Sequence, residues 1–402
     1  MKSLYDKIFH HYWNPYWAIS IAGMLSAVYF GITNTVWAVT GEFTRLGGHL
    51  LNLLGMDISD WKYFQMIGME GSTFSRSDGW IVWGMFIGAF ITILLSNNFK
   101  IRIPRQKRRI IQGFVGGIIA GFGARLALGC NLAAFFTGVP QFSLHSWIFM
   151  LATAIGTYFG FKIIQTKWWK GKPKLQKGSV PSMIKQGRPV QPIAGGILAF
   201  AYAVLIIYFY VSGKQLLGTA ALFGAAFGIL IERGQICFTS AFRDLWVSGR
   251  AKMAKAIALG MAVSTVFTFA VIIIYGLEPV TKLAAPSTFI GGVLFGTGIV
   301  LAAGCETGMM YRLMEGQVQY IAVFAGNIIG ATFLAYGWDH LGIFDTLASS
   351  GSKINLLHIM QPYAALAITL VMLGMWYFIA VYWEKNYRFG IGFRKGAKHH
   401  GN

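Results

Sequence analysis

The chain has 402 residues, of which 55% are apolar and only 12% are charged. Soluble globular proteins usually carry about a quarter of charged residues, so this composition excludes that class and indicates a multi-pass membrane protein. Lys and Arg (34) outnumber Asp and Glu (14), but the excess gathers in short loops. This placement favours the positive-inside asymmetry of membrane proteins over binding to nucleic acid.

Ten apolar stretches reach, or nearly reach, the about 20 residues that a helix needs to cross the hydrocarbon. They run over 17–39, 79–96, 111–129, 143–165, 192–211, 216–231, 253–275, 287–303, 318–336 and 360–383. The N-terminal segment has no short apolar core followed by a small-residue cleavage site, so we expect it to be retained.

The loops between these stretches differ in charge. The loop 97–110, the linker 166–191 and the tail 385–402 are strongly basic and are expected on the cytoplasmic side. Segment 40–78 carries five acidic against three basic residues, and 276–286 is nearly neutral. These last two segments are therefore expected outside.

This charge pattern divides the chain into four parts. We expect a first membrane repeat at 1–165, a cytoplasmic linker at 166–191, a second membrane repeat at 192–384 and a cytoplasmic tail at 385–402. Both termini are then cytoplasmic.

Glycines four residues apart recur in most of the apolar stretches, and such pairs let helix backbones approach closely in lipid. The pairs are Gly84/Gly88, Gly117/Gly121, Gly156/Gly160, Gly224/Gly228, Gly292/Gly296 and Gly326/Gly330. Packing is the predicted role of most of them.

The sequence also contains an internal repeat. Segment 116–130 recurs at 291–305 with a constant offset (305 − 130 = 175) and eight identical pairs in fifteen positions. Its skeleton is small-x3-small-x8-Cys, and it includes all three cysteines of the chain. The four copies are Ala27/Gly31/Thr40, Gly117/Gly121/Cys130, Gly224/Gly228/Cys237 and Gly292/Gly296/Cys305.

Following the chain through the assigned loops gives the direction of each copy. The first-half copies run outward and the second-half copies run inward. The sequence therefore predicts an all-α membrane protein of two inverted-topology repeats, each with two copies of the small-x3-small-x8-Cys/Thr element. Transporters use this symmetry around a site near the bilayer midplane.

Gly-Cys at 129–130 and 304–305 comes where an apolar stretch ends and a polar, non-spanning segment begins. A short helix starting there would direct its first N–H groups toward the thiol and favour an anion. A lone cysteine would be explained by packing, but three in one repeated frame favour a function. A straight helix from Ile110 would rise about 30 Å over twenty residues, which would place Cys130 outside and Cys305 inside unless the segments are tilted or re-entrant.

Charged residues within apolar stretches are a second signal, because each is costly in the bilayer unless paired or hydrated. Arg125 has no acid in its own segment and is the best candidate to meet an anion. Glu306 directly follows Cys305, and Glu232/Arg233 precede Cys237. Internal ion pairs remain the alternative for all of them. The candidate path residues are Cys130, Cys237, Cys305, Thr40, Arg125, Asn131, Gln235 and Glu306.

Other kinds of site have little support. His145 is expected to have a capping or interfacial role. No nucleophile and base pair, phosphate loop or metal-ligand spacing is present in the sequence, so we expect no catalytic residue, metal or cofactor.

Three stretches, GARLALGCN (123–131), GQICFTSAFRD (234–244) and GCETG (304–308), resemble the YeeE/YedE family of bacterial sulfur-transport membrane proteins. The resemblance covers nearly the whole chain and is strongest to the YedE branch, associated with selenium metabolism. It implies an hourglass-like, multi-pass protein of the bacterial inner membrane in which cysteines handle thiosulfate in the YeeE branch. The chain departs from the YeeE pattern at Thr40, where that pattern has a cysteine, and Cys237 supplies the third thiol instead.

Two hypotheses follow. The first is a transporter, not an enzyme, that imports a small inorganic sulfur- or selenium-containing anion along a cysteine-lined path, with the lipid bilayer as its other partner and no nucleic acid. The second is a membrane chalcogen transferase that forms a cysteine persulfide or selenosulfide and passes it to a small soluble cytoplasmic sulfur-carrier protein. The sequence favours transport, because no cysteine has a second, resolving cysteine adjacent to it in the chain.

Overall fold

The computed structural model of the protein describes residues 5–170 and 190–387. Most of the predicted linker 166–191 and tail 385–402 lie outside the described residues. Within the described residues, ten helices are long and apolar enough to cross a membrane, one for each predicted stretch. The prediction of an all-α, multi-pass membrane protein is confirmed.

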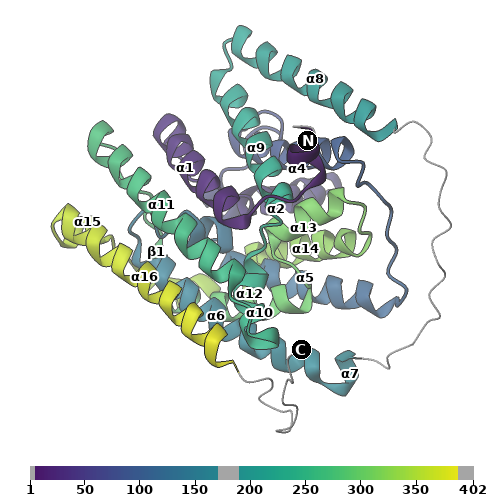
Figure 1. The fold of residues 1–402 in the computed structure, drawn as a ribbon. Helices are drawn as coiled ribbons and strands as arrows, with labels where there is room; N and C mark the ends of the chain where they lie inside the picture. Colours follow the sequence, from purple (N-terminus) through teal and green to yellow (C-terminus); the bar gives the residue numbers. More distant parts are fainter. Residues whose placement is uncertain (1–4, 171–189, 388–402) are drawn as a thin grey trace.

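The long helices form a bundle (Figure 1). They are α1 (Pro15–Thr33), α4 (Ser77–Leu95), α5 (Arg108–Leu126), α6 (Leu144–Gln165), α8 (Val190–Val211), α9 (Gln215–Arg233), α11 (Lys252–Tyr275), α12 (Pro286–Leu301), α14 (Gln319–His340) and α16 (Pro362–Asn386). Two of them, α8 and α16, bury the smallest share of their length and lie at the edge of the bundle (Figure 1).

Shorter elements connect the long helices. The short α-helices are α2 (Thr40–Leu53), α3 (Lys62–Ile67), α7 (Lys167–Lys170), α10 (Phe238–Ser248), α13 (Glu306–Met314) and α15 (Leu356–Ile359). The π-helical turns are η1 (Asp6–His10), η2 (Asn131–Phe136) and η3 (Phe344–Ala348). Strands β1 (Leu283–Ala284) and β2 (Ser352–Lys353) pair antiparallel, with Leu283 opposite Lys353.

The long helices pack in matched pairs. Helix α1 packs on α11 and α4 packs on α9, while α5 packs on α14 and α12 packs on α6. Each of these pairs joins a helix of the first half of the chain to one of the second half. Two further contacts, α5 with α12 and α1 with α9, also join the two halves. The helices that precede the cysteines therefore lie inside the bundle.

Glycine makes these contacts close, as predicted. A Cβ added at Gly84 of α4 would lie 2.9 Å from the Ala221 carbonyl oxygen and 2.9 Å from the Gly224 Cα, both on α9. At all twelve glycines of the six predicted pairs, an added Cβ would come within 4 Å of the backbone of a neighbouring helix. Without a hydrophobic driving force in lipid, such close backbone packing holds helices together.

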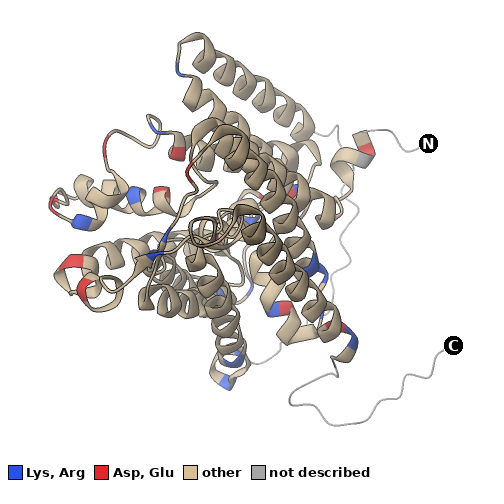
Figure 2. Cartoon of the chain, turned by 90° about the vertical axis from the view of Figure 1, so that its left-hand side faces the viewer, with Lys and Arg blue, Asp and Glu red and all other residues tan. Residues whose placement is uncertain are grey.

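Most Lys, Arg, Asp and Glu residues lie at helix ends and in loops, as Figure 2 shows. Near Cys237, Arg233 is fully buried and pairs with Glu232, and its guanidinium also donates to Ser96 Oγ at 3.2 Å. Arg243 Nη2 pairs with Asp244 at 2.8 Å. For these pairs the structure supports the ion-pair interpretation left open by the sequence.

The glycine contacts predict a large difference between two Gly→Ala variants. In Gly121→Ala the new methyl group would overlap the Asn327 backbone of α14, which should destabilise the protein by about 1–3 kcal/mol. Gly374→Ala on α16 has no atom within 4 Å and serves as the matched control, neutral or stabilising by up to about 1 kcal/mol. Thermal unfolding in detergent measures both, and equal unfolding temperatures would contradict the packing argument.

Candidate functional site

Each cysteine lies in a break between a long helix and a short one. Cys130 precedes η2, Cys237 precedes α10 and Cys305 precedes α13, in each case as the N-cap residue, separated by three residues from the end of the long helix. Short helices therefore do start directly after Cys130 and Cys305, as the argument for an anion site required. Discontinuous helices of this kind bring helix ends and free backbone groups into the interior of transporters.

The three breaks share one backbone turn. The residue two positions before each cysteine is a non-glycine with a left-handed φ: Leu128 (56°), Gln235 (49°) and Ala303 (61°). The next N–H closes the turn by donating to the carbonyl five residues earlier, as in a Schellman motif. These bonds are Gly129 to Ala124 (2.7 Å), Ile236 to Ile231 (2.9 Å) and Gly304 to Ile299 (3.0 Å).

Residues without glycine's freedom rarely adopt a positive φ, and such conformations persist only where the surrounding structure fixes them. The tertiary structure supplies one such restraint at the first break. His145 is completely buried, and its Nε2 donates to the Ala127 carbonyl oxygen at 2.7 Å. The capping role expected for His145 is therefore fulfilled inside the protein, not at an interface.

The thiols of Cys237 and Cys305 are direct neighbours. Cys305 Sγ accepts a hydrogen bond from the Gly308 N–H at 3.4 Å. A Cβ added at Gly308 would lie 2.9 Å from Cys237 Sγ and 3.7 Å from Cys305 Sγ. Glycine is thus required at position 308 for the two sulfur atoms to come together.

Cys130 forms a second group with residues from both halves. Its thiol lies beside the Thr40 hydroxyl at the start of α2 and beside the Glu306 carboxyl. Glu306 Oε1 accepts a hydrogen bond from Asn327 Nδ2 at 3.2 Å. The Glu306 carboxyl group is buried, and Arg125 is a cation near it.

The two groups are continuous because Glu306 follows Cys305 in the chain. All three cysteines are buried and unpaired, and all three belong to the same buried core of the bundle. Helices α5 and α12 both end before the cysteine, so neither cysteine lies on a straight, unbroken helix.

Two of the eight candidates differ from the rest. Asn131 is 1% exposed, and neither end of its amide has a hydrogen-bond partner within the described part of the chain. Gln235 instead turns away from the thiols. Its Nε2 donates to the Glu232 carbonyl oxygen at 2.9 Å and to Glu315 Oε1 at 3.3 Å.

Several buried polar atoms near the thiols have no protein partner in residues 5–170 and 190–387. They are Thr40 Oγ1, Arg125 Nε, both amide atoms of Asn131, Thr239 Oγ1, Glu306 Oε2 and Asn327 Oδ1. Buried polar atoms are nearly always hydrogen-bonded. Their concentration here therefore suits a polar ligand or water.

Three residues near the thiols were missed by the sequence analysis. Arg312 Nη1 donates to the Ala303 carbonyl oxygen (2.8 Å) and to the Tyr320 hydroxyl (2.7 Å), and Lys282 Nζ donates to the Ala133 carbonyl oxygen (3.0 Å). Both lie outside the repeated motif. Asn327, the third, could have been found as a polar residue within an apolar span.

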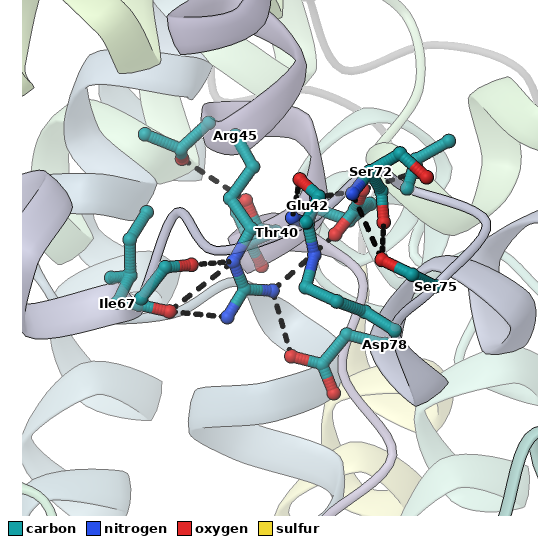
Figure 3. Close-up of polar contacts among 12 residues, drawn as sticks. Thr40, Glu42, Arg45, Ile67, Ser72, Ser75 and Asp78 are labelled. Carbon is teal, nitrogen blue, oxygen red and sulfur yellow. Dashed lines mark hydrogen bonds and ion pairs between the residues drawn. The ribbon is translucent and has the colours of Figure 1, made fainter. Parts of the chain in front are cut away.

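An ion-pair cluster holds the segment that follows α2 against this helix, which begins at Thr40 (Figure 3). Arg76 Nη2 pairs with Glu42 at 2.9 Å. Arg45 Nη1 pairs with Glu42 at 3.3 Å and with Asp78 at 2.8 Å. Buried ionised groups need such partners, and the cluster thereby fixes the helix end that carries the Thr40 hydroxyl.

Within the part of the chain that the structure describes, no group of three or more His, Cys, Asp or Glu side chains is placed to hold a metal ion.

The neighbouring thiols predict a dithiol reaction. Phenylarsine oxide needs two adjacent sulfur atoms and should protect Cys237 and Cys305 together from later maleimide labelling, leaving Cys130 reactive after unfolding. Peptide mass spectrometry measures the labelling. Cys237→Ser should remove the protection of Cys305, whereas Cys130→Ser should leave it unchanged. Independent protection of all three cysteines would show that the pair is not formed.

Comparison with known proteins supports the family resemblance that the three sequence motifs indicated. The family model described as "Sulphur transport" matches residues 1–159 and 233–395. "Probable transporter YedE" of Escherichia coli (strain K12) is 50% identical over 389 residues, 96% of this chain and 95% of that protein. The protein of that name from Salmonella typhimurium is 50% identical over 379 residues, 94% of each chain.

"Thiosulfate transporter TsuA" of Escherichia coli (strain K12) is 34% identical over 161 residues, 39% of this chain and 42% of that protein. The family match covers most of both halves, and the two YedE proteins align almost end to end. The chain therefore belongs to the sulphur transport family, which includes the YeeE and YedE proteins.

Proposed function

We propose that this protein imports a small inorganic sulfur- or selenium-containing anion, thiosulfate-like in chemistry, along a path lined by Cys130, Cys237 and Cys305. The observation that supports the proposal is that all three buried thiols lie at helix breaks, with buried polar atoms nearby that have no protein partner in the described residues. The names of the relatives, probable transporters and thiosulfate transporters, support the same class of cargo.

The chemistry of this path suits such an anion. Helices α10 and α13 begin directly after Cys237 and Cys305, which are their N-cap residues, so their N-terminal partial positive charges lie next to the thiol pair. Arg125 adds a full positive charge near Cys130. A polarizable S–H donates to sulfur or selenium without the desolvation cost of a second full charge. Contacts of this strength permit release as well as binding.

We also propose that the two halves, 1–165 and 192–384, are inverted repeats. A two-fold axis in the membrane plane would exchange α1 with α9, α4 with α11, α5 with α12 and α6 with α14. The observed packing fits this exchange, since α1–α11 corresponds to α9–α4 and α5–α14 to α12–α6. The same exchange relates the Thr40–Cys130 neighbours to the Cys237–Cys305 neighbours.

The proposed orientation places both termini in the bacterial cytoplasm and segment 40–78 outside the inner membrane. The basic loop 97–110 and linker 166–191 support it through the positive-inside rule.

The transport proposal predicts that Cys130→Ala and Cys305→Ala each abolish uptake while the protein stays folded. Uptake of labelled thiosulfate into proteoliposomes containing the full chain measures this effect. Gly374→Ala, distant from the thiols, is the control and should keep wild-type uptake. Undiminished uptake by the Cys130→Ala/Cys305→Ala double variant would refute the thiol path. Competition by sulfite, selenite and selenate then identifies the preferred cargo.

The second candidate, a chalcogen transferase, gains support from the adjacent Cys237 and Cys305 thiols, because a second thiol beside the first can resolve a persulfide. In that reaction a cysteine thiolate takes the outer sulfur of thiosulfate and releases sulfite. The persulfide sulfur then passes to a thiol of a soluble carrier protein. Mass spectrometry after thiosulfate exposure decides: an added sulfur atom on a cysteine supports transfer, and unmodified cysteines support hydrogen-bonded passage.

The proposed orientation predicts opposite labelling of two introduced cysteines. Lys107→Cys should react with a membrane-impermeant maleimide only in inside-out vesicles, whereas Lys353→Cys should react only in intact spheroplasts. The buried native thiols give the background, measured in the unmodified chain. The reverse pattern would invert the topology, and labelling of both sites from one side would contradict the inverted repeats.

A further inference from the structure

The outer loop between α11 and α12 directs one lysine toward the Cys130 turn. We propose that Lys282 binds the incoming sulfur oxyanion at the outer end of the path, before the anion reaches Cys130. This inference rests on the proposed function and names a binding residue that lies outside the repeated motif.

The ammonium group of Lys282 lies against the break before η2. Lys282 Nζ donates to the Ala133 carbonyl oxygen at 3.0 Å. A Cβ added at Gly129 would lie 2.7 Å from the same nitrogen. The lysine side chain therefore runs inward from the outer loop and ends beside the turn that carries Cys130.

The loop that carries Lys282 is held on both sides. The Lys282 N–H donates to Ser143 Oγ at 3.4 Å, and the Val280 N–H donates to Gln141 Oε1 at 2.9 Å. Asn355 Nδ2 donates to Thr281 Oγ1 at 2.7 Å. Strand pairing of Leu283 with Lys353 continues this anchoring, so the position of the ammonium group is fixed before any ligand binds.

Lys282 has donors to spare. An ammonium group has three N–H bonds, and Ala133 is its one hydrogen-bond acceptor among the described residues. By contrast, the guanidinium of Arg312 is committed to the Ala303 carbonyl and the Tyr320 hydroxyl and lies over the Tyr311 ring. Of these two cations near Gly-Cys turns, Lys282 is the one left with capacity for an anion.

A second, independent feature at this place points to a ligand. The Asn131 amide is buried directly after Cys130 and has no partner in the described residues. Arg125 adds positive charge near both Lys282 and Cys130. A divalent oxyanion next to Cys130 would thus meet an ammonium group, a guanidinium group and an amide donor, which are the groups that bind such anions through charge-assisted hydrogen bonds.

The charge of Lys282 responds to pH in a useful range. Burial lowers the pKa of Lys282 to about 8, with the neighbouring Cys130 opposing the decrease and Arg125 adding to it. The charged or titratable groups around Lys282 are Arg125, Cys130 and His145, with Glu306 next to the first two. Lys282 is protonated below its pKa, so the positive charge at this end is present at pH 7 and is lost as pH rises toward 9.

The first test compares thiosulfate uptake by full-length wild-type protein, Lys282→Met, Lys282→Arg and Lys353→Met in proteoliposomes. Lys282→Met should raise the KM for thiosulfate about tenfold or more, because it removes a charge-assisted contact, and should change the maximal rate much less. Lys353→Met removes an exposed lysine on the paired strand and should leave KM unchanged. A wild-type KM in Lys282→Met would overturn the proposal.

The second test uses the pH profile and remains informative if Lys282→Met does not fold. At low thiosulfate, wild-type uptake should fall between pH 7 and pH 9, while Lys282→Arg should stay nearly constant, because arginine remains charged. An equal fall in both proteins would assign the pH dependence to another group, such as Cys130, and would reject Lys282. Failure of wild-type protein to take up any thiosulfate would instead reject the proposed function itself.

Discussion

Buried polar groups inside a membrane-spanning bundle must find their partners within the protein, and this constraint governs the arrangement around the three cysteines. Breaking a helix frees backbone groups that lipid cannot satisfy. Here the freed groups are partly recovered by the turn itself, through the bonds from Gly129, Ile236 and Gly304 to the carbonyls five residues before them. At the third break one further N–H, that of Gly308, donates to Cys305 Sγ at 3.4 Å, so part of the backbone freed by the break contacts a thiol.

The close helix packing serves the same constraint. Helices α5 and α12 approach at glycine, where an added Cβ at Gly123 would contact the Gly291 carbonyl. Bulkier residues there would separate the two helices that end at the Cys130 and Cys305 turns. The glycines thus hold the breaks of the two halves near one another, and the ion pairs of Glu42 with Arg45 and Arg76 hold the segment that follows α2 over Thr40.

The sequence predicted the long helices well because a membrane span needs a continuous apolar run, and composition alone reveals such a run. It also placed the short helices after Cys130 and Cys305, since polar residues follow each Gly-Cys pair. It did not reveal the turn. Glycine would mark a left-handed position, but these positions hold Leu128, Gln235 and Ala303, whose conformation is imposed by tertiary contacts. Lys282 was missed for a similar reason, because only the folded loop brings it to a break more than a hundred residues away in the chain.

The two halves of the proposed path are alike in backbone and different in charge. Asn131 and Glu306 occupy corresponding positions, each directly after a cysteine, yet one is neutral and the other is a carboxyl group. A carboxylate beside Cys130 would repel an anion unless its charge were balanced, and Arg125 and Asn327 are the residues that interact with it. An anion in the proposed path would therefore compete with Glu306 for Arg125. Such competition would weaken the interaction of Arg125 with the anion, and it arises from Glu306, which the second copy of the repeat has in place of Asn131.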